Sequence, residues 1–417
     1  MQVHSPPSRV RYQVLLFTLF LAAISYLDRV CISMAAPAIK HDLGLTDWQM
    51  SKIFSAFTLT YALFEIPSGW LADRFGPRLM LARIVIGWSI LTIATGWSVG
   101  FLSLLLIRLL FGAAEAGTFP GISRVYSHWL PKPFHATAFG LAIMTGALAG
   151  GLSQPLIAKL LEISNWHLVF TIFGSLGFIW ALLWLLYFRD WPQNHPQVNE
   201  SELALIGNDP SEPEPDFSWK TIFQNRNIPW LCLMYFGVIY GWYFYLTWFP
   251  TYLMRNFNLD LMGTGYLSSL PLFGIALGVS LGGWTSDRWI KILGEDRGRR
   301  LPGLLGLPCA ALMILMATHC EQGWSAAMMI AIAAALSAFG VASAWSVCVT
   351  IGGKQAGVIS GTMNTFGNLG GATSPLVFGY LIQKGHAWNL PLYTIAVAYL
   401  ISAFAWGMIS LKKYRPA

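Results

Sequence analysis

The sequence has few charged residues for its length. Asp, Glu, Lys and Arg make up 11% of the 417 residues, whereas hydrophobic residues make up 55%. A soluble domain carries roughly 25% charged residues, because it needs them to cover a surface exposed to water. This shortage excludes a soluble protein, and the long unbroken apolar runs exclude a membrane barrel, whose strands alternate polar and apolar residues. The chain is therefore predicted to be an all-α membrane protein.

Cysteine is also scarce. The five cysteines show neither CxxC spacing nor a Cys/His cluster, so the sequence predicts no disulfide and no metal site. The motif HExxH and the P-loop are missing as well. We therefore expect no cofactor and no enzymatic activity.

Twelve apolar segments are long enough to cross a bilayer as helices. An acidic, proline-rich stretch at 189–227 separates the first six from the last six and is expected to be a solvated cytosolic linker. This division predicts two six-helix bundles, at 1–188 and 228–417. The predicted spans are 12–36, 49–72, 79–97, 101–123, 136–158, 167–188, 228–253, 263–285, 301–319, 323–347, 356–383 and 391–411.

The net charge of +7 follows the membrane topology. With the N-terminus in the cytosol, 19 of the 26 Lys and Arg residues lie in cytosolic segments or span ends, four lie outside and three lie within spans. Cytosolic loops of membrane proteins carry such an excess, so both termini are predicted to be cytosolic. The basic excess therefore does not indicate nucleic-acid binding.

Two short motifs recur in the two halves. Residues 69–74 (GWLADR) after span 2 are echoed by 283–288 (GWTSDR) after span 8, and 150–155 (GGLSQP) by 370–375 (GGATSP). Two duplicated six-helix halves are typical of a secondary transporter, whose site between the halves opens alternately to either side of the membrane.

Five ionisable residues lie deep in the predicted spans: Asp28, Arg29, Glu65, Arg108 and Glu115. Each costs roughly 2.5 kcal/mol or more to insert, so each calls for a reason. Two arginines at similar depth suit the carboxylate of an anion, and a buried carboxylate can carry a coupled proton. The alternative is a neutral network that pins helices together, and Glu65 is expected to brace helices.

The second half has polar and aromatic candidates instead. Asn364 and Asn368 are four residues apart and share one helix face, and Trp345 lies among serines of span 10. Such groups suit a hydroxyl-rich ligand, although packing is the alternative role for the aromatic rings. Tyr26 and Tyr61 are further candidates because they lie at the depth of the charges in spans 1 and 2.

The loop GWLADRFGPR at 69–78 resembles the signature loop of the major facilitator superfamily, and it lies between spans 2 and 3 as in that family. An aspartate at a helix N-terminus can pair with arginines and brace the cytosolic ends of neighbouring helices. A tight turn with topology-setting charges is the alternative. The residues concerned are Asp73, Arg74, Arg78, Asp287 and Arg288.

Segments 26–29 (YLDR), 108–120 (RLLFGAAEAGTFP) and 364–369 (NTFGNL) resemble the anion:cation symporter branch of that superfamily. This branch includes bacterial galactonate, glucarate and hexuronate permeases and is related to sialin and the vesicular glutamate transporters. The resemblance implies proton-coupled import of an organic anion, often a sugar acid, by alternating access. It assigns the carboxylate to Arg29 and Arg108, the polyol to Tyr26, Tyr61 and Asn364, a further contact to Trp345, and proton transfer to Asp28 and Glu115.

One segment departs from the branch, because 129–136 (WLPKPFHA) lacks the Glu-Arg pair that usually follows span 4. The alternatives are a sodium-coupled or exchange carrier of another carboxylate, such as an aromatic acid or an organophosphate, and a transporter-like sensor or enzyme. The expected partners are a small organic anion, protons and membrane lipid, without nucleic acid. We expect a multi-pass monomer in the bacterial inner membrane.

Overall fold

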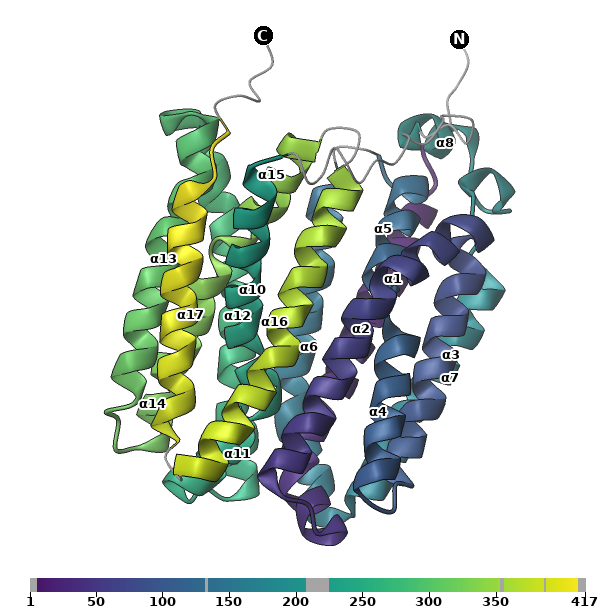
Figure 1. Ribbon diagram of the computed structural model, residues 1–417. Coiled ribbons are helices and arrows are strands. Elements are labelled where there is room, and N and C mark those ends of the chain that lie inside the picture. The colour runs from purple at the N-terminus through teal and green to yellow at the C-terminus, as the bar shows by residue number, and fades with distance from the viewer. Residues whose placement is uncertain (1–5, 132–133, 208–224, 353–355, 386–387, 412–417) are drawn as a thin grey trace.

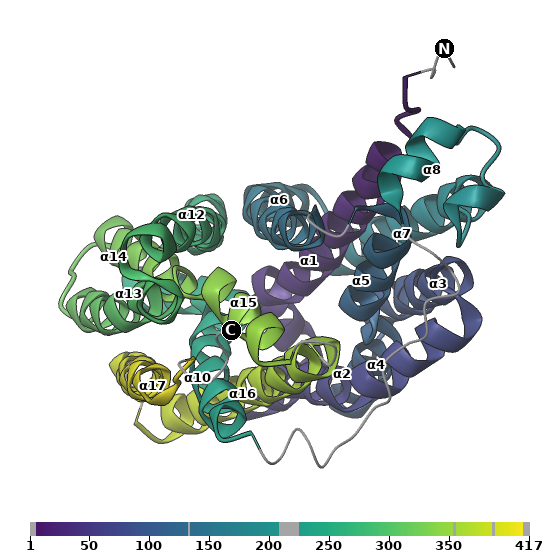
Figure 2. The same ribbon diagram turned by 90° about the horizontal axis from the view of Figure 1, so that it is seen from above.

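The computed structural model describes residues 6–131, 134–207, 225–352, 356–385 and 388–411, with side chains except at 72–73, 136, 356–357 and 385. Every regular element within these ranges is a helix, which confirms the all-α prediction. The long helices stand side by side in two groups that follow the order of the chain (Figures 1 and 2).

The first group of helices is built by local signals that the sequence carries. α2 begins where Thr46 and Gln49 form a capping box, in which each side chain bonds the backbone of the other. α1 ends at Gly44, whose φ of 62° is open to glycine without a steric penalty. The group comprises α1 (Val10–Leu43), α2 (Asp47–Phe75), α3 (Pro77–Gly96), α4 (Phe101–Glu115), α5 (Thr118–Trp129), α6 (His135–Ile163) and α7 (Trp166–Tyr187).

The second group repeats this order. Its longest helix, α12, begins at the N-cap Asp260, which accepts a hydrogen bond from the backbone N–H of Gly263 at 3.1 Å. The group comprises α10 (Asn227–Thr247), α11 (Phe249–Phe257), α12 (Leu261–Leu293), α13 (Glu295–Ala317), α14 (Gly323–Ala338), α15 (Val341–Gly352), α16 (Ala356–Gly385) and α17 (Asn389–Met408).

Three predicted spans are divided between two helices rather than continuous. The span at 228–253 divides at Trp248, between α10 and α11. The span at 101–123 divides at Ala116 and Gly117, where Gly117 has a φ of 92°, and the span at 323–347 divides at Phe339 and Gly340. The breaks in the spans at 101–123 and 323–347 fall in the fourth span of each half and therefore fit the duplication. Broken helices at matching positions of two repeats are a mark of transporter binding sites.

The helices account for twelve crossings. Counting each broken pair as one, ten helices of the described chain are long and apolar enough to cross a membrane. α2 and α16 have 29 and 30 residues, which also suffices. The N-terminal end of α1 and the C-terminal end of α17 lie on the same side of the helix bundle (Figure 1), as an even number of crossings requires.

The halves meet along two seams, α2 against α16 and α6 against α12 (Figure 2). In the first seam, the Ser55 hydroxyl donates a hydrogen bond to the carbonyl oxygen of Ala372 at 2.6 Å. In the second, Gly265 lies so close that an added Cβ would come within 2.8 Å of the Ala158 Cβ. Small residues thus allow the close backbone approach that packing in a membrane needs.

The first part of the predicted linker is ordered against the N-terminal half. It forms a short helix, α8 (Glu200–Ile206), after a 3-10 turn at Pro192–Asn194. The buried Glu202 carboxylate accepts hydrogen bonds from the backbone N–H groups of Val10 and Arg11, at 3.2 and 3.1 Å, and from the Arg11 guanidinium at 2.9 Å. The free N–H groups at the start of α1 explain this docking, which the expectation of a solvated linker missed.

Candidate functional site

A small cavity lies between α1, α2 and α4 of the first half and α10 of the second. It has a volume of about 20 Å³, which is room for about one water molecule. Both arginines singled out in the sequence line it, so the structure brings Arg29 and Arg108 together. The lining residues are Arg29, Ile32, Ile53, Phe54, Phe57, Arg108, Phe111, Tyr243, Leu246 and Thr247.

Arg29 is held by a buried ion pair with Glu115. Its Nε and Nη2 atoms both lie 2.9 Å from the same carboxylate oxygen of Glu115, which also accepts a hydrogen bond from the Ser25 hydroxyl at 2.5 Å. The guanidinium carbon lies 4.8 Å from the ring centre of Tyr61 and 5.8 Å from that of Tyr26, which adds cation–π attraction. Four of the predicted site residues thus form one cluster.

Arg108 has a different environment. It donates a hydrogen bond to the Thr95 hydroxyl at 3.2 Å, and its guanidinium carbon lies 4.8 Å from the ring centre of Phe111. No carboxylate of the described residues forms an ion pair with it. This buried cation therefore has its positive charge uncompensated by direct contact.

Asp28 is buried, with 2% of its surface exposed, and neither of its carboxylate oxygens has a hydrogen-bond partner in the described structure. Asp28 lies within electrostatic range of Glu115 and Arg108, but it forms no ion pair with Arg29 or Arg108 in the described structure. Of the two carboxylates expected to pair with the arginines, Glu115 therefore contacts one in the described structure and Asp28 contacts neither.

The candidates of the second half lie outside the cavity lining. The Trp345 ring centre is 5.1 Å from that of Phe139, and Asn364 donates a hydrogen bond from its amide to Glu65. Asn368 donates to the other carboxylate oxygen of Glu65 at 3.3 Å. Glu65 thus joins α2 to α16. Its sequence position predicted that Glu65 braces helices but did not identify its partner.

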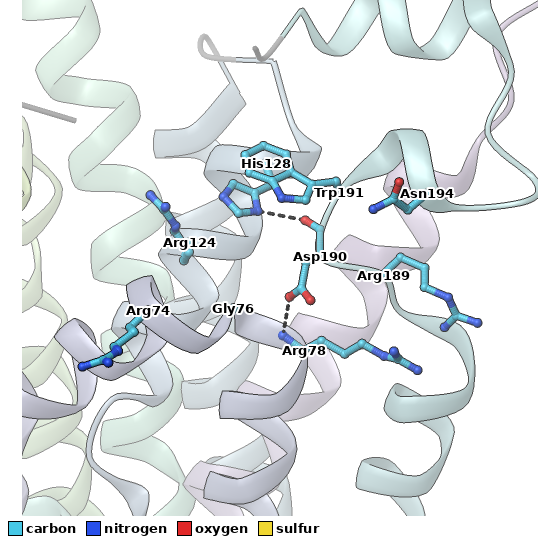
Figure 3. A pocket seen from close by; sticks show the side chains of 9 residues that line it. All are labelled: Arg74, Gly76, Arg78, Arg124, His128, Arg189, Asp190, Trp191 and Asn194. Atoms are coloured by element: carbon cyan, nitrogen blue, oxygen red, sulfur yellow. Dashed lines mark hydrogen bonds between the residues drawn. The ribbon is translucent and has the colours of Figure 1, made fainter. Parts of the chain in front are cut away.

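The signature loop lies beside a second pocket of about 390 Å³ (Figure 3). Gly76 has a φ of 77°, and an added Cβ would lie 2.8 Å from the carboxylate of Asp190, so glycine is required there. The same carboxylate accepts a hydrogen bond from the backbone N–H of Arg78 at 2.8 Å. The lining residues are Arg74, Gly76, Arg78, Arg124, His128, Arg189, Asp190, Trp191 and Asn194.

The four charged side chains of this loop and its repeat that the structure describes do not converge on one point. The side chains of Arg74 and Arg78 point in different directions (Figure 3), and the Arg78 guanidinium donates to the carbonyl oxygen of Leu185. The side chain of Asp73 lies outside the described structure. Asp287 and Arg288 are exposed at the end of α12, without an ion pair among the described residues. The bracing role of these five residues stays a prediction.

The opposite face carries a charged clasp between the halves. The Asp47 carboxylate at the start of α2 lies 2.9 Å from the Arg255 guanidinium of α11 and also pairs with Lys40 of α1. Burial alone would raise the pKa of Asp47, but the hydrogen bonds from Arg255 and Lys40 outweigh it and lower the pKa below its usual range. The clasp holds the halves together on the side that the charge distribution predicts to be external.

Comparison with known proteins connects this architecture to transport. The chain is 32% identical over 390 residues to a probable sulfoacetate transporter of Cupriavidus necator, covering 92% of this chain and 90% of that protein. It is 32% identical over 422 residues to a probable galactarate/D-glucarate transporter of Bacillus subtilis, covering 94% and 91%. A D-galactonate transporter of Escherichia coli is 30% identical over 422 residues, with 97% and 96% covered.

Solved structures share the same fold. A bacterial homolog of the human lysosomal transporter Spinster, in an inward-facing and unoccupied conformation, superposes with a TM-score of 0.79 at 20% identity, covering 98% of this chain and 99% of that one. The model of the Major Facilitator Superfamily matches residues 18–375. The chain therefore belongs to the Major Facilitator Superfamily and is a multi-pass membrane transporter, not an enzyme.

Proposed function

We propose that this transporter imports an organic anion, of the sugar-acid class, together with protons. One observation carries the proposal: two buried arginines line a single cavity between the halves, and only Arg29 has a carboxylate partner in the described structure. Arg108 is then the cation that meets the carboxylate of the substrate, because a planar guanidinium suits that group best. The names of the relatives support the same substrate class.

The protons are assigned to Glu115 and Asp28. Glu115 holds Arg29 through a buried ion pair, and protonation of Glu115 would weaken that pair and free the guanidinium for the substrate. Asp28 has no donor on its carboxylate in the described structure, so its neutral form is the one that burial favours. Loss of the two protons toward the cytosol would then restore the ion pair and expel the anion.

The transport cycle requires the halves to move. The cavity of about 20 Å³ is too small for a sugar acid, so the substrate enters only when the seams open. The clasp of Asp47 with Arg255 closes the side predicted to be external. Opening that side separates α2 from α11, after which Tyr61 and Asn364 are placed to meet the hydroxyl groups of the substrate.

The test is uptake of labelled anions into proteoliposomes. The panel contains galactonate, glucarate, glucuronate, sulfoacetate, an aromatic acid and an organophosphate, each with an inward proton gradient, with an inward sodium gradient and without either. Arg108→Ala is compared with Arg83→Ala, which removes an exposed arginine of α3. We expect uptake of one or more sugar acids that needs the proton gradient, persists in Arg83→Ala and is lost in Arg108→Ala.

Other outcomes name the rival functions. Uptake driven by sodium alone would replace proton coupling by sodium coupling, and uptake that needs only internal substrate would indicate an exchanger. A preference for sulfoacetate would indicate a function like that of the relative named for it. Two arginines also suit an anion that carries both a carboxylate and a sulfonate. A neutral solute that moves equally well through Arg108→Ala would overturn the anion site.

A further inference from the structure

Glu65 is a buried acid that belongs to neither the cluster around Arg29 nor the signature loop. Only 3% of its surface is exposed, and it lies on α2 four residues after Tyr61 and eight after Phe57. Residues spaced by four share one helix face, so Glu65 continues the wall that Phe57 contributes to the central cavity. It lies about 12 Å along the helix from Phe57, in the direction of the signature loop.

Its hydrogen-bond donors come from the other half of the protein. One carboxylate oxygen accepts from the amide of Asn364 and the other accepts from that of Asn368, at 3.3 Å. The two asparagines are four residues apart on α16, so a single helix face presents both amides to one carboxylate. Each oxygen of Glu65 thus receives one neutral donor from across the seam.

No cation neutralises this carboxylate by contact in the described structure. Arg29 of α1 is within electrostatic range, but its guanidinium is engaged by Glu115. The other titratable groups that face Glu65 are the hydroxyls of Tyr61 on α2 and Tyr235 on α10. Among the described residues, no charged side chain of α3 or α4 contacts it. The two amides are therefore what stabilises its negative charge.

Loss of one amide changes the balance between the two forms of this carboxyl group. A buried carboxylate is stable only while it is paired or hydrogen-bonded, and otherwise it takes up a proton. Asn364 is also the amide expected to meet the hydroxyls of a substrate. The carboxylate and the substrate would therefore compete for the same donor.

We propose that Glu65 is a proton-accepting latch: it holds Asn364 and Asn368 while the site is empty, and it takes a proton from solvent when an organic anion draws the Asn364 amide away. The neutral carboxyl group then remains buried on Asn368 alone, and the seam between α2 and α16 loosens. This adds a proton site beyond Glu115 and Asp28, and it rests on the proposed function.

The test counts the protons taken up when substrate binds. Purified protein is titrated, near neutral pH, with the acid that it transports, by calorimetry in two buffers of different ionisation enthalpy. Glu65→Gln keeps the shape and an acceptor oxygen for Asn364 but cannot take the proton. The matched control is Glu162→Gln, which changes an acid at the end of α6 that is partly exposed and pairs with Lys159 on the surface.

We expect Glu65→Gln to take up between about half a proton and one proton fewer than the native protein, and Glu162→Gln to match the native count. Glu65→Gln should also bind about threefold to tenfold more tightly, because the substrate no longer displaces a carboxylate from the amide. Equal proton counts in Glu65→Gln and native protein would overturn the latch, whatever happens to the affinity.

A second variant keeps the test decisive if Glu65→Gln does not fold. Asn368→Ala leaves the acid in place with one donor fewer, so part of Glu65 is already protonated before substrate arrives. Its proton uptake on binding should therefore also be lower than native, and an unchanged count would contradict the latch. If the native protein binds no acid of the panel, the proposed function falls first, and the latch falls with it.

Discussion

The N-terminal half buries ionisable side chains in its membrane helices, whereas the buried polar groups described in the C-terminal half are amides, hydroxyls and the polar atoms of aromatic side chains. Asp28, Arg29, Arg108 and Glu115 lie on α1 and α4, and the matching α10 and α14 offer residues such as Tyr243 and Ser337 instead. The two halves nevertheless share the order of their helices and the break in the fourth span. A duplicated backbone thus carries two different sets of side chains.

The difference indicates a division of labour. Charges can sense an anion and a proton, and the cost of burying them is contained when they pair with one another within one half. Neutral amides and rings can read the rest of the substrate without disturbing that balance. Glu65 is the exception, because it is an acid of the first half whose donors belong to the second.

The largest effect is expected from the charges. Glu115→Gln keeps the size of the side chain but removes the negative charge that holds Arg29. Uptake driven by the proton gradient should fall at least about a hundredfold, while exchange of internal for external substrate persists. Both are measured in proteoliposomes beside Glu162→Gln, and loss of exchange together with driven uptake would make Glu115 a structural residue.

The second-largest effect is a loss of stability that should be equal in the two halves, because close helix packing is common to both. An added methyl group at Gly112 would overlap the carbonyl oxygen of Phe57, and one at Gly370 would overlap that of Phe236. Gly112→Ala and Gly370→Ala should each lower stability by roughly 2 kcal/mol, seen as a lower Tm in detergent. Gly361→Ala is the control, because an added Cβ there meets nothing within 4 Å. A variant as stable as this control would refute the close approach between the two helices that it joins.

A smaller effect is expected from the neutral half of the site. Asn364→Ala removes one amide that is proposed to bind the hydroxyl groups of the substrate. KM should therefore rise about threefold to tenfold, while uptake still depends on protons. Asn389→Ala, at the start of α17, provides the control. Loss of proton dependence in Asn364→Ala would break the proposed division between the halves.

The smallest effect should come from the outer clasp. Arg255 is 44% exposed and Asp47 is 21% exposed, so Arg255→Ala should change the affinity for external substrate by less than about fivefold. Asp47 precedes the predicted span at 49–72, and its pKa is lowered, so the clasp is fully formed above the usual pKa of an aspartate. It is lost as the pH falls through the lowered value.

Affinity measured against pH checks this clasp. The difference between native protein and Arg255→Ala should vanish in acid, whereas Lys384→Ala, which changes an exposed lysine of α16, should behave as native at every pH. A difference that persists in acid would show that Arg255 acts through something other than Asp47.

Much of the fold was predictable because membrane helices reveal themselves by length and composition. The spans and the duplication followed from apolar runs and recurring motifs. The breaks were missed because hydropathy does not register backbone geometry. Gly117, three residues before Pro120, and Gly340 carried the available signal. The docking of α8 was missed because nothing in the sequence distinguishes Glu202 from the other acids of the linker. Only its hydrogen bonds to the start of α1 do so.

The candidate site was predictable where helical spacing determines it. Depth alone placed Arg29 and Arg108 near each other, and the structure brings them to one cavity. The contact of Glu65 with Asn364 was beyond sequence reasoning, because it joins residues 299 positions apart across the two halves. The roles of all these residues in binding and coupling stay predictions.

The most direct test of the central claim compares a transported sugar acid with the alcohol in which CH2OH replaces the carboxylate. Binding of both is measured to native protein, to Arg108→Ala and to Arg83→Ala. Native protein and Arg83→Ala should prefer the acid by about a hundredfold or more, and Arg108→Ala should lose most of that preference. A preference that survives in Arg108→Ala, or native protein that binds both compounds alike, would contradict the claim that the charged half recognises the anion.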